Sequence, residues 1–95
     1  MKHSFYLDGS KISSKHTFFK EISSVIFPDF EWKYSYSYDI LSDILDGGYG
    51  LIYGYEHYTI HWQNFKNSAK KMDEETLFDI LSSFDGMTNV SLVLE

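Results

Sequence analysis

Apolar and polar residues alternate with two different periods along this chain. A period of two, typical of strands, covers residues 3–7 and 57–62, and residues 90–94 are almost continuously apolar. We therefore expect three strands, near residues 3–7, 57–62 and 89–94. The apolar run in the last strand predicts burial on both of its faces.

A helical period fills the intervals between these strands. Ser13 or Ser14 can cap a first helix, which ends near Pro28. Asp73 can cap a last helix, which ends before Gly86. The expected apolar stripes of these two helices are Phe18, Phe19, Ile22 and Ile26 in the first, and Leu77, Ile80, Leu81 and Phe84 in the last.

Two further helical segments complete the order of elements. We expect a helix over residues 37–46 and a short helix or helical turn at residues 63–68. The order is then β-α-α-β-α-α-β, and strands separated by helices pair in parallel through right-handed crossovers. We predict a single α/β domain over residues 1–95, with a three-stranded parallel sheet packed by three main helices.

The helix expected at residues 37–46 is acidic along one face. Asp39, Asp43 and Asp46 share that face, and Gly47 can end the helix. The opposite face is expected to gather the apolar residues Ile40, Leu41, Ile44 and Leu45. Like charges one turn apart repel by a few tenths of a kcal/mol per pair, which gives the fold no benefit. The acidic face therefore indicates a surface for a cationic partner.

Aromatic residues surround this helix in sequence. Residues 29–36, which include Trp32 and Tyr36, alternate like a strand without an obvious partner, so we expect an extended connection. Tyrosines outside periodic elements are frequent interface contacts, but they can also shield a small core. Both interpretations stay open at this point for Tyr34, Tyr36, Tyr49, Tyr53 and Tyr55.

The overall composition narrows the class of partner. The net charge is −6 and all eight basic residues are Lys, which argues against nucleic-acid binding. The absence of Cys excludes disulfides and thiolate zinc sites. Neither a membrane span nor a signal peptide is evident, so we expect a cytoplasmic protein without membrane contact.

Four segments of the sequence resemble the barstar family of bacterial ribonuclease inhibitors. Residues 5–9 (FYLDG) and a helix ending near residue 28 are similar to the family's opening strand, turn and helix. Residues 38–45 (YDILSDIL) resemble its second helix, and residues 58–68 (YTIHWQNFKNS) its middle strand and following turn. Residues 90–94 close the resemblance, which covers nearly the whole chain.

The resemblance implies an intracellular inhibitor that lays its second helix and the preceding loop across a ribonuclease active site. Asp39 and Asp43 occupy the two family positions that contact the enzyme. Carboxylates at this spacing can replace substrate phosphates among cationic side chains. We thus expect an immunity protein that binds a cognate toxin, a basic ribonuclease, one to one. The expected partner-binding residues are Asp39, Asp43, Asp46, Tyr36, Tyr49 and Trp32.

The chain departs from the family pattern on this expected contact surface. Residues 35–37 replace a Gly-x-Asn motif, Ser42 replaces an aromatic residue, and residues 47–54 form an unusual loop rich in Gly and Tyr. These departures indicate a toxin different from the family's usual partner. The alternative is a barstar-like protein-interaction domain whose partner is not a ribonuclease.

Catalytic and metal-binding interpretations are weaker. Asp39 and Asp43 have a spacing similar to that of glycosidase carboxylates, but one exposed helix offers no substrate cleft. His57 and His61 lie on one face of a strand, where a polar structural role is more common than metal ligation. The glycines of residues 46–50 lack the context of a phosphate loop. We therefore expect no enzyme activity, no metal and no cofactor.

Overall fold

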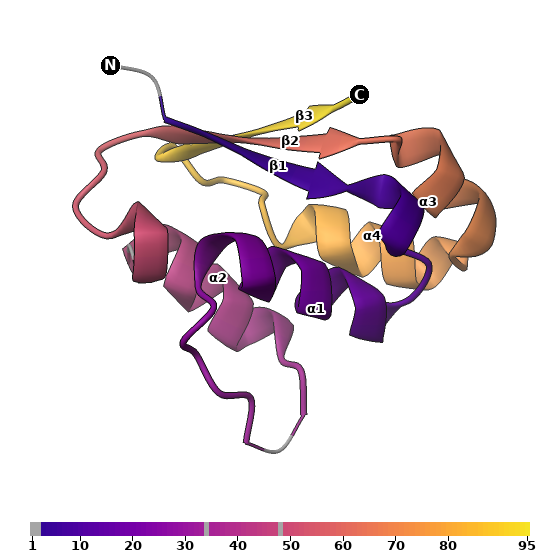
Figure 1. Cartoon of the computed structure of the whole chain (residues 1–95), viewed down its shortest axis with the longest axis horizontal. Helices are drawn as coiled ribbons and strands as arrows, with labels where there is room; N and C mark the ends of the chain where they lie inside the picture. Colours follow the sequence, from indigo (N-terminus) through magenta and orange to yellow (C-terminus); the bar gives the residue numbers. More distant parts are fainter. Residues whose placement is uncertain (1–2, 34, 48) are drawn as a thin grey trace.

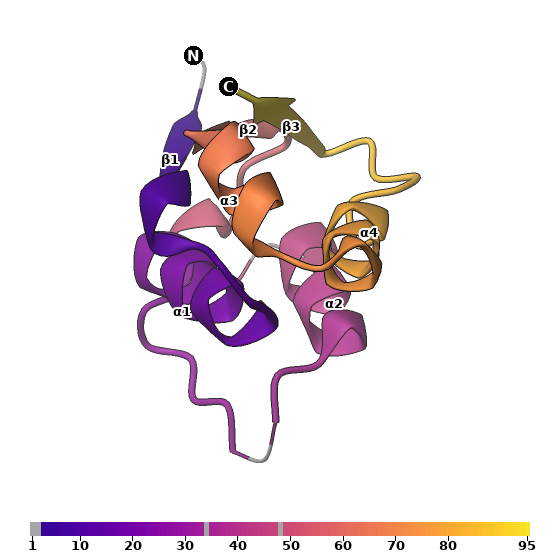
Figure 2. The same cartoon turned by 90° about the vertical axis from the view of Figure 1, so that its right-hand side faces the viewer.

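Three strands and four α-helices alternate in the computed structural model, which describes residues 3–33, 35–47 and 49–95 (Figure 1). The elements are β1 (Ser4–Asp8), η1 (Gly9–Lys11), α1 (Lys15–Ile26), α2 (Tyr38–Gly47), η2 (Gly50–Ile52), β2 (Tyr58–Gln63), α3 (Phe65–Lys71), α4 (Glu74–Ser82) and β3 (Val90–Leu94). The helices lie on one side of the sheet, and the loop between α1 and α2 projects away from it (Figures 1 and 2).

The sheet is parallel throughout. β2 lies in the middle and pairs in parallel with β1 on one side and with β3 on the other. Two helices connect each strand to the next, because a parallel partner has to begin at the same end of the sheet. The predicted α/β fold is therefore confirmed, with α1, α2 and α4 as the three main helices and α3 as the short one.

The two faces of the sheet have different surroundings. Ile60 and Trp62 point toward the helices and are fully buried, whereas Tyr6 on the other face is 52% exposed. Val93 and Leu94 of β3 are also 38% and 46% exposed. The prediction that the last strand is buried on both faces is wrong, because β3 is an edge strand and the helices cover one face of the sheet (Figure 2).

Side-chain caps fix the starts of the first and last helices. The Ser14 hydroxyl accepts the N–H of Thr17 at 3.2 Å, and the Thr17 hydroxyl accepts the N–H of Ser14 at 2.9 Å. Asp73 accepts the N–H of Thr76 at 3.1 Å. The predicted stripe of α1 is buried in full, and Ile80 of α4 is fully buried with its three predicted neighbours packed against the core.

A buried hydrogen-bond relay joins β2, α3 and the first turn of the chain. The indole Nε1 of Trp62 donates to Ser68 Oγ at 3.0 Å, and Ser68 Oγ donates to the Gly9 carbonyl at 2.8 Å. The backbone approaches closely here, because a Cβ on Gly9 would lie 2.2 Å from the carbonyl oxygen of Gln63. The relay holds the corner between β2 and α3 against β1 and thereby fixes the scaffold beneath the helices.

Candidate functional site

The acidic row, defined as Asp39, Asp43 and Asp46, lies exposed on α2. Leu41 and Leu45 on the other side of this helix are fully buried. The amphipathic pattern therefore turns the three carboxylates toward solvent, as predicted. Among the described residues, the salt bridge of the structure joins His61 to Glu95, away from α2. The three carboxylates of the acidic row therefore have no salt-bridge partner in this part of the chain.

Ile40 departs from the apolar face expected for α2. Its side chain is 42% exposed, whereas Ile44 and Leu45 are buried. At about 100° per residue, Ile40 lies between Asp43 and Ile44, at the boundary between the acidic row and the core. The expectation for Ile40 is therefore wrong, because the helix turns this boundary position toward the loop that precedes it.

Three side-chain hydrogen bonds anchor α2 to the rest of the domain. The hydroxyl of Tyr58 and the Nδ2 of Asn89 both donate to the Leu45 carbonyl, each at 2.8 Å. The Ser42 hydroxyl donates to the Ser83 carbonyl at 3.2 Å. Burial raises the pKa of Tyr58, so this hydroxyl keeps its proton and remains a donor. The acidic row thus sits on a helix that is tied to β2, to the start of β3 and to the end of α4.

Trp32 and Tyr36 fasten the loop between α1 and α2. The Trp32 Nε1 donates to Ser23 Oγ at 2.9 Å, and its ring meets Phe19 edge-on at a centroid distance of 5.1 Å. Tyr36 stacks on Phe19 at 4.9 Å. Both predicted contact residues are half-buried, so they hold the loop in place and still expose part of their surface to solvent.

The other tyrosines divide between the two interpretations left open by the sequence. Tyr49 is 45% exposed and meets the ring of Phe30 edge-on at 5.6 Å. Tyr53 is exposed as well, whereas Tyr55 packs against the core. Tyr34 lies outside the described residues. Tyr49 and Tyr53 are therefore exposed to solvent, whereas Tyr55 shields the core.

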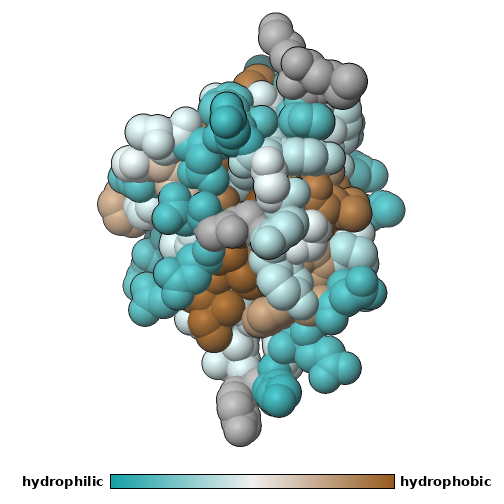
Figure 3. Space-filling view, turned by 90° about the vertical axis from the view of Figure 1, so that its left-hand side faces the viewer, coloured by the Kyte–Doolittle hydropathy of each residue, from teal (hydrophilic) through white to brown (hydrophobic). Residues whose placement is uncertain are grey.

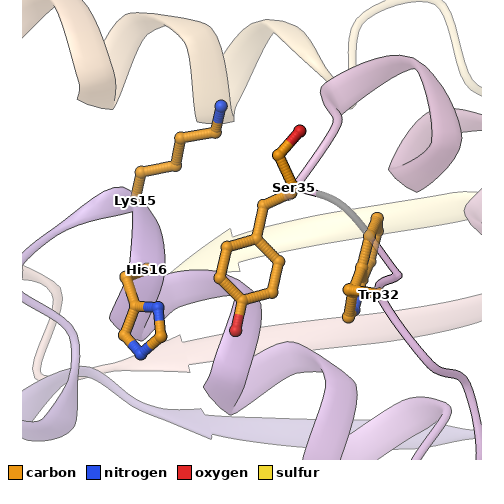
Figure 4. A pocket seen from close by; sticks show the side chains of 5 residues that line it. Lys15, His16, Trp32 and Ser35 are labelled. Carbon is orange, nitrogen blue, oxygen red and sulfur yellow. The ribbon is translucent and has the colours of Figure 1, made fainter.

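A hollow of about 540 Å³ lies between the loop and the first residues of α1 (Figure 4). Lys15 and His16 approach it from α1, and Trp32 and Ser35 approach it from the loop. The Lys15 ammonium lies 4.7 Å from the ring centroid of Tyr38, within the range of a cation–π interaction. This side of the loop therefore carries a positive charge, in contrast to the acidic row.

A second depression of about 450 Å³ lies between the same loop and α2. Its lining residues define what we call the apolar groove: Phe30, Glu31, Trp32, Lys33, Ser35, Ser37 and Ile40. Figure 3 shows apolar side chains exposed among hydrophilic ones on one face of the molecule. Because Ile40 lies next to Asp43 around α2, the groove borders the acidic row.

A smaller notch of about 200 Å³ lies between α2 and α4, and it adds an acid that the sequence analysis missed. Asp39 lines this notch from α2, and Asp79 lines it from α4. Burial raises the pKa of Tyr38 beside them, and the negative charges of Asp79 and Asp73 raise it further. No single-sequence pattern marks Asp79, because its place beside Asp39 depends on how the two helices pack.

The two histidines of the middle strand bond to separate partners. His57 Nε2 lies 3.1 Å from Ser91 Oγ, and His61 Nδ1 lies 3.1 Å from Glu95 Oε1. Within the described ranges, no group of three or more His, Asp or Glu side chains is placed to hold a metal ion. These contacts favour the polar structural role over metal ligation. In the same part of the chain, no helix has the length and apolar character needed to cross a bilayer.

Comparison with known protein families finds a match over most of the chain. The family described as Barstar (barnase inhibitor) matches residues 2–91. No curated protein matches the chain in sequence. The match covers nearly the whole domain, including the acidic row, the loop that precedes it, β1, β2 and the first two residues of β3. The chain therefore belongs to the barstar family.

Proposed function

We propose that this chain is an immunity protein that binds a basic ribonuclease toxin one to one and blocks its active site. The observation that carries the proposal is the exposed acidic row on an anchored helix of a barstar-family domain. The working location is the cytoplasm of a bacterial cell, where an inhibitor protects the cell from its own toxin. The proposal requires no cofactor, membrane or direct contact with nucleic acid.

The chemistry follows from what a ribonuclease has to bind. Its active site holds RNA phosphates with cationic side chains, and a carboxylate accepts the same charge-assisted hydrogen bonds. Asp39 and Asp43 lie one turn apart and are the two principal contacts, with Asp46 in support. Trp32, Tyr36 and Tyr49 flank them from the neighbouring loops and add apolar contact area.

The rigid attachment of α2 favours tight binding. Hydrogen bonds from Tyr58, Asn89 and Ser42 fix the helix before the partner arrives, so little ordering is required on association. The net charge of −6 also speeds the encounter with a basic protein, and this steering weakens as salt rises.

The test measures inhibition of RNA cleavage by barnase and by any small basic protein encoded beside the gene of this chain. We expect complete inhibition of the cognate ribonuclease at a one-to-one ratio. Barnase serves as the comparison, because residues 35–37, Ser42 and residues 47–54 depart from the family pattern on the expected contact surface. Asp39→Asn and Asp43→Asn should each weaken binding by roughly 2–5 kcal/mol, because each leaves a desolvated cation unpaired on the partner.

Asp73→Ala is the matched control for these variants, because Asp73 is an exposed acid that already caps α4. It should lower stability modestly, because the α4 cap is lost, and leave affinity unchanged. If Asp39→Asn and Asp43→Asn change affinity less than threefold while Asp73→Ala changes it more, the proposal has placed the interface on the wrong helix. Binding of a neighbouring gene product that does not cleave RNA would support the non-ribonuclease alternative instead.

A further inference from the structure

The apolar groove presents carbon surface that the fold leaves uncovered. Ile40 exposes 42% of its side chain, although Leu41 and Leu45 on the same helix are fully buried. A branched apolar side chain gains nothing from this exposure, and Ile is a weaker helix former than Ala or Leu. Its place beside Asp43 therefore points to contact with another molecule.

The opposite wall of the groove is aromatic and already held in place. Phe30 and Trp32 pack edge to face at a centroid distance of 4.8 Å. The single polar atom of the Trp32 ring donates to Ser23 at 2.9 Å, so the ring has no donor left for a ligand. Phe30 in turn meets Tyr49 at 5.6 Å. The wall thus offers apolar contact in a geometry fixed before binding.

The charges around the groove identify its occupant. Glu31 lines the groove, and Asp39 and Asp43 lie on the next face of α2. Lys33 is the one basic residue among the described residues of the lining. A second copy of this chain is disfavoured, because two molecules with net charge −6 would bring their acidic rows together. The fitting occupant is an uncharged apolar side chain on a surface that is otherwise basic.

We propose that the apolar groove receives an aromatic or branched aliphatic side chain of the toxin, next to the cations bound by the acidic row. The inference rests on the proposed function and assigns the groove a role in partner choice. Charge pairing is shared by many basic ribonucleases, but an apolar side chain at this one position is not. Partners without such a side chain leave Phe30 and Ile40 in contact with water and bind more weakly.

Binding kinetics separate the groove from the acidic row. Ile40→Gln replaces the apolar surface with a polar side chain of similar size and does not lower the helix propensity of this position. The dissociation rate is measured for the complex with the ribonuclease that the wild type inhibits. We expect the Ile40→Gln complex to dissociate about tenfold faster than the wild-type complex, equal to about 1.4 kcal/mol, at both low and high salt. Asp43→Asn should speed dissociation and also slow association, and its effect on association should shrink as salt rises.

Two further variants serve as controls. Phe78→Gln removes another exposed apolar side chain, on α4 and outside the groove lining, and should leave both rate constants unchanged. Ile40→Leu should restore slow dissociation. If Ile40→Gln stays within twofold of wild type while Asp43→Asn weakens binding, the groove is empty in the complex and the proposed function still holds.

A measurement without the toxin tests the groove separately. It remains informative even if no ribonuclease binds, a result that would contradict the proposed function itself. The probes are N-acetyl-phenylalanine methylamide and, as a polar comparison, N-acetyl-glutamine methylamide, each titrated into labelled protein and followed by NMR. Shifts at Phe30, Trp32 and Ile40 with the first probe, lost in Ile40→Gln, support an apolar binding groove. No shifts at these residues, or equal shifts with both probes, overturn it.

Discussion

Replacing Tyr58 with Phe removes one hydroxyl from the junction between α2 and the sheet. That hydroxyl donates to the Leu45 carbonyl at 2.8 Å, and the Tyr58 side chain is 1% exposed. The ring packing remains, and the carbonyl keeps its second donor, Asn89 Nδ2, at 2.8 Å. The loss is thus one ordinary hydrogen bond of about 1 kcal/mol. For a domain of this size the melting temperature should fall by roughly 4–8 °C.

Alkaline pH reveals a second property of the same hydroxyl. Burial, reinforced by the negative charge of Asp46, raises the pKa of Tyr58 above its ordinary value of 10.0. Above pH 10 the unfolded chain releases this proton while the folded protein keeps it, so the free energy of unfolding falls as pH rises. By pH 11 the wild type should lose about 1.4 kcal/mol that Tyr58→Phe does not lose. The stability difference between the two proteins should then close near pH 11.

Urea unfolding followed by circular dichroism at pH 7, 9 and 11 measures both effects. Tyr53→Phe is the matched control, because Tyr53 is 78% exposed and should leave the unfolding curves unchanged at each pH. A difference between wild type and Tyr58→Phe that stays constant up to pH 11 would refute the pKa argument. A Tyr58→Phe variant as stable as wild type at pH 7 would refute the hydrogen-bond argument.

Two further substitutions test the buried relay. Ser68→Ala leaves Trp62 Nε1 and the Gly9 carbonyl without their partner, and should lower the free energy of unfolding by roughly 2–4 kcal/mol in urea. Ser83→Ala is its control and should lower the free energy of unfolding by less than about 1 kcal/mol, because the Asp79 carbonyl that accepts the Ser83 hydroxyl also accepts a backbone N–H. Equal losses in the two variants would contradict the stabilising role of the relay. Gly9→Ala forces a methyl group to 2.2 Å from the Gln63 carbonyl, so a loss of at least about 1–3 kcal/mol is expected, and a stable, soluble variant would show that the backbone yields there.

The parts of the fold that follow from local chemistry were predictable from the sequence. Ser14 and Asp73 begin their helices as expected, because a cap depends on a side chain and a backbone N–H three residues away. The parallel sheet followed from the alternation of strands and helices. The exposure of Val93 did not follow, because an apolar run looks the same in a central strand and in an edge strand.

The candidate site was also predictable only where it depends on spacing within one element. The acidic row follows from helical spacing alone, since one turn brings the carboxylates to one face. The place of Asp79 beside Asp39 depends on the packing of α4 against α2, and the exposure of Ile40 depends on the path of the loop before α2. Spacing within one element carries no information about either.

The attachment of α2 also has a consequence for when a newly made chain becomes active. The two side chains that donate to the Leu45 carbonyl, those of Tyr58 and Asn89, lie 13 and 44 residues further along the chain. At roughly 5–20 residues per second, the ribosome adds the second donor about 2 to 9 seconds after Leu45 itself. Contacts between distant segments also form more slowly than local ones. Under the proposed function, a cell is therefore protected only by molecules that are already complete and folded, so synthesis of the inhibitor has to precede exposure to the toxin.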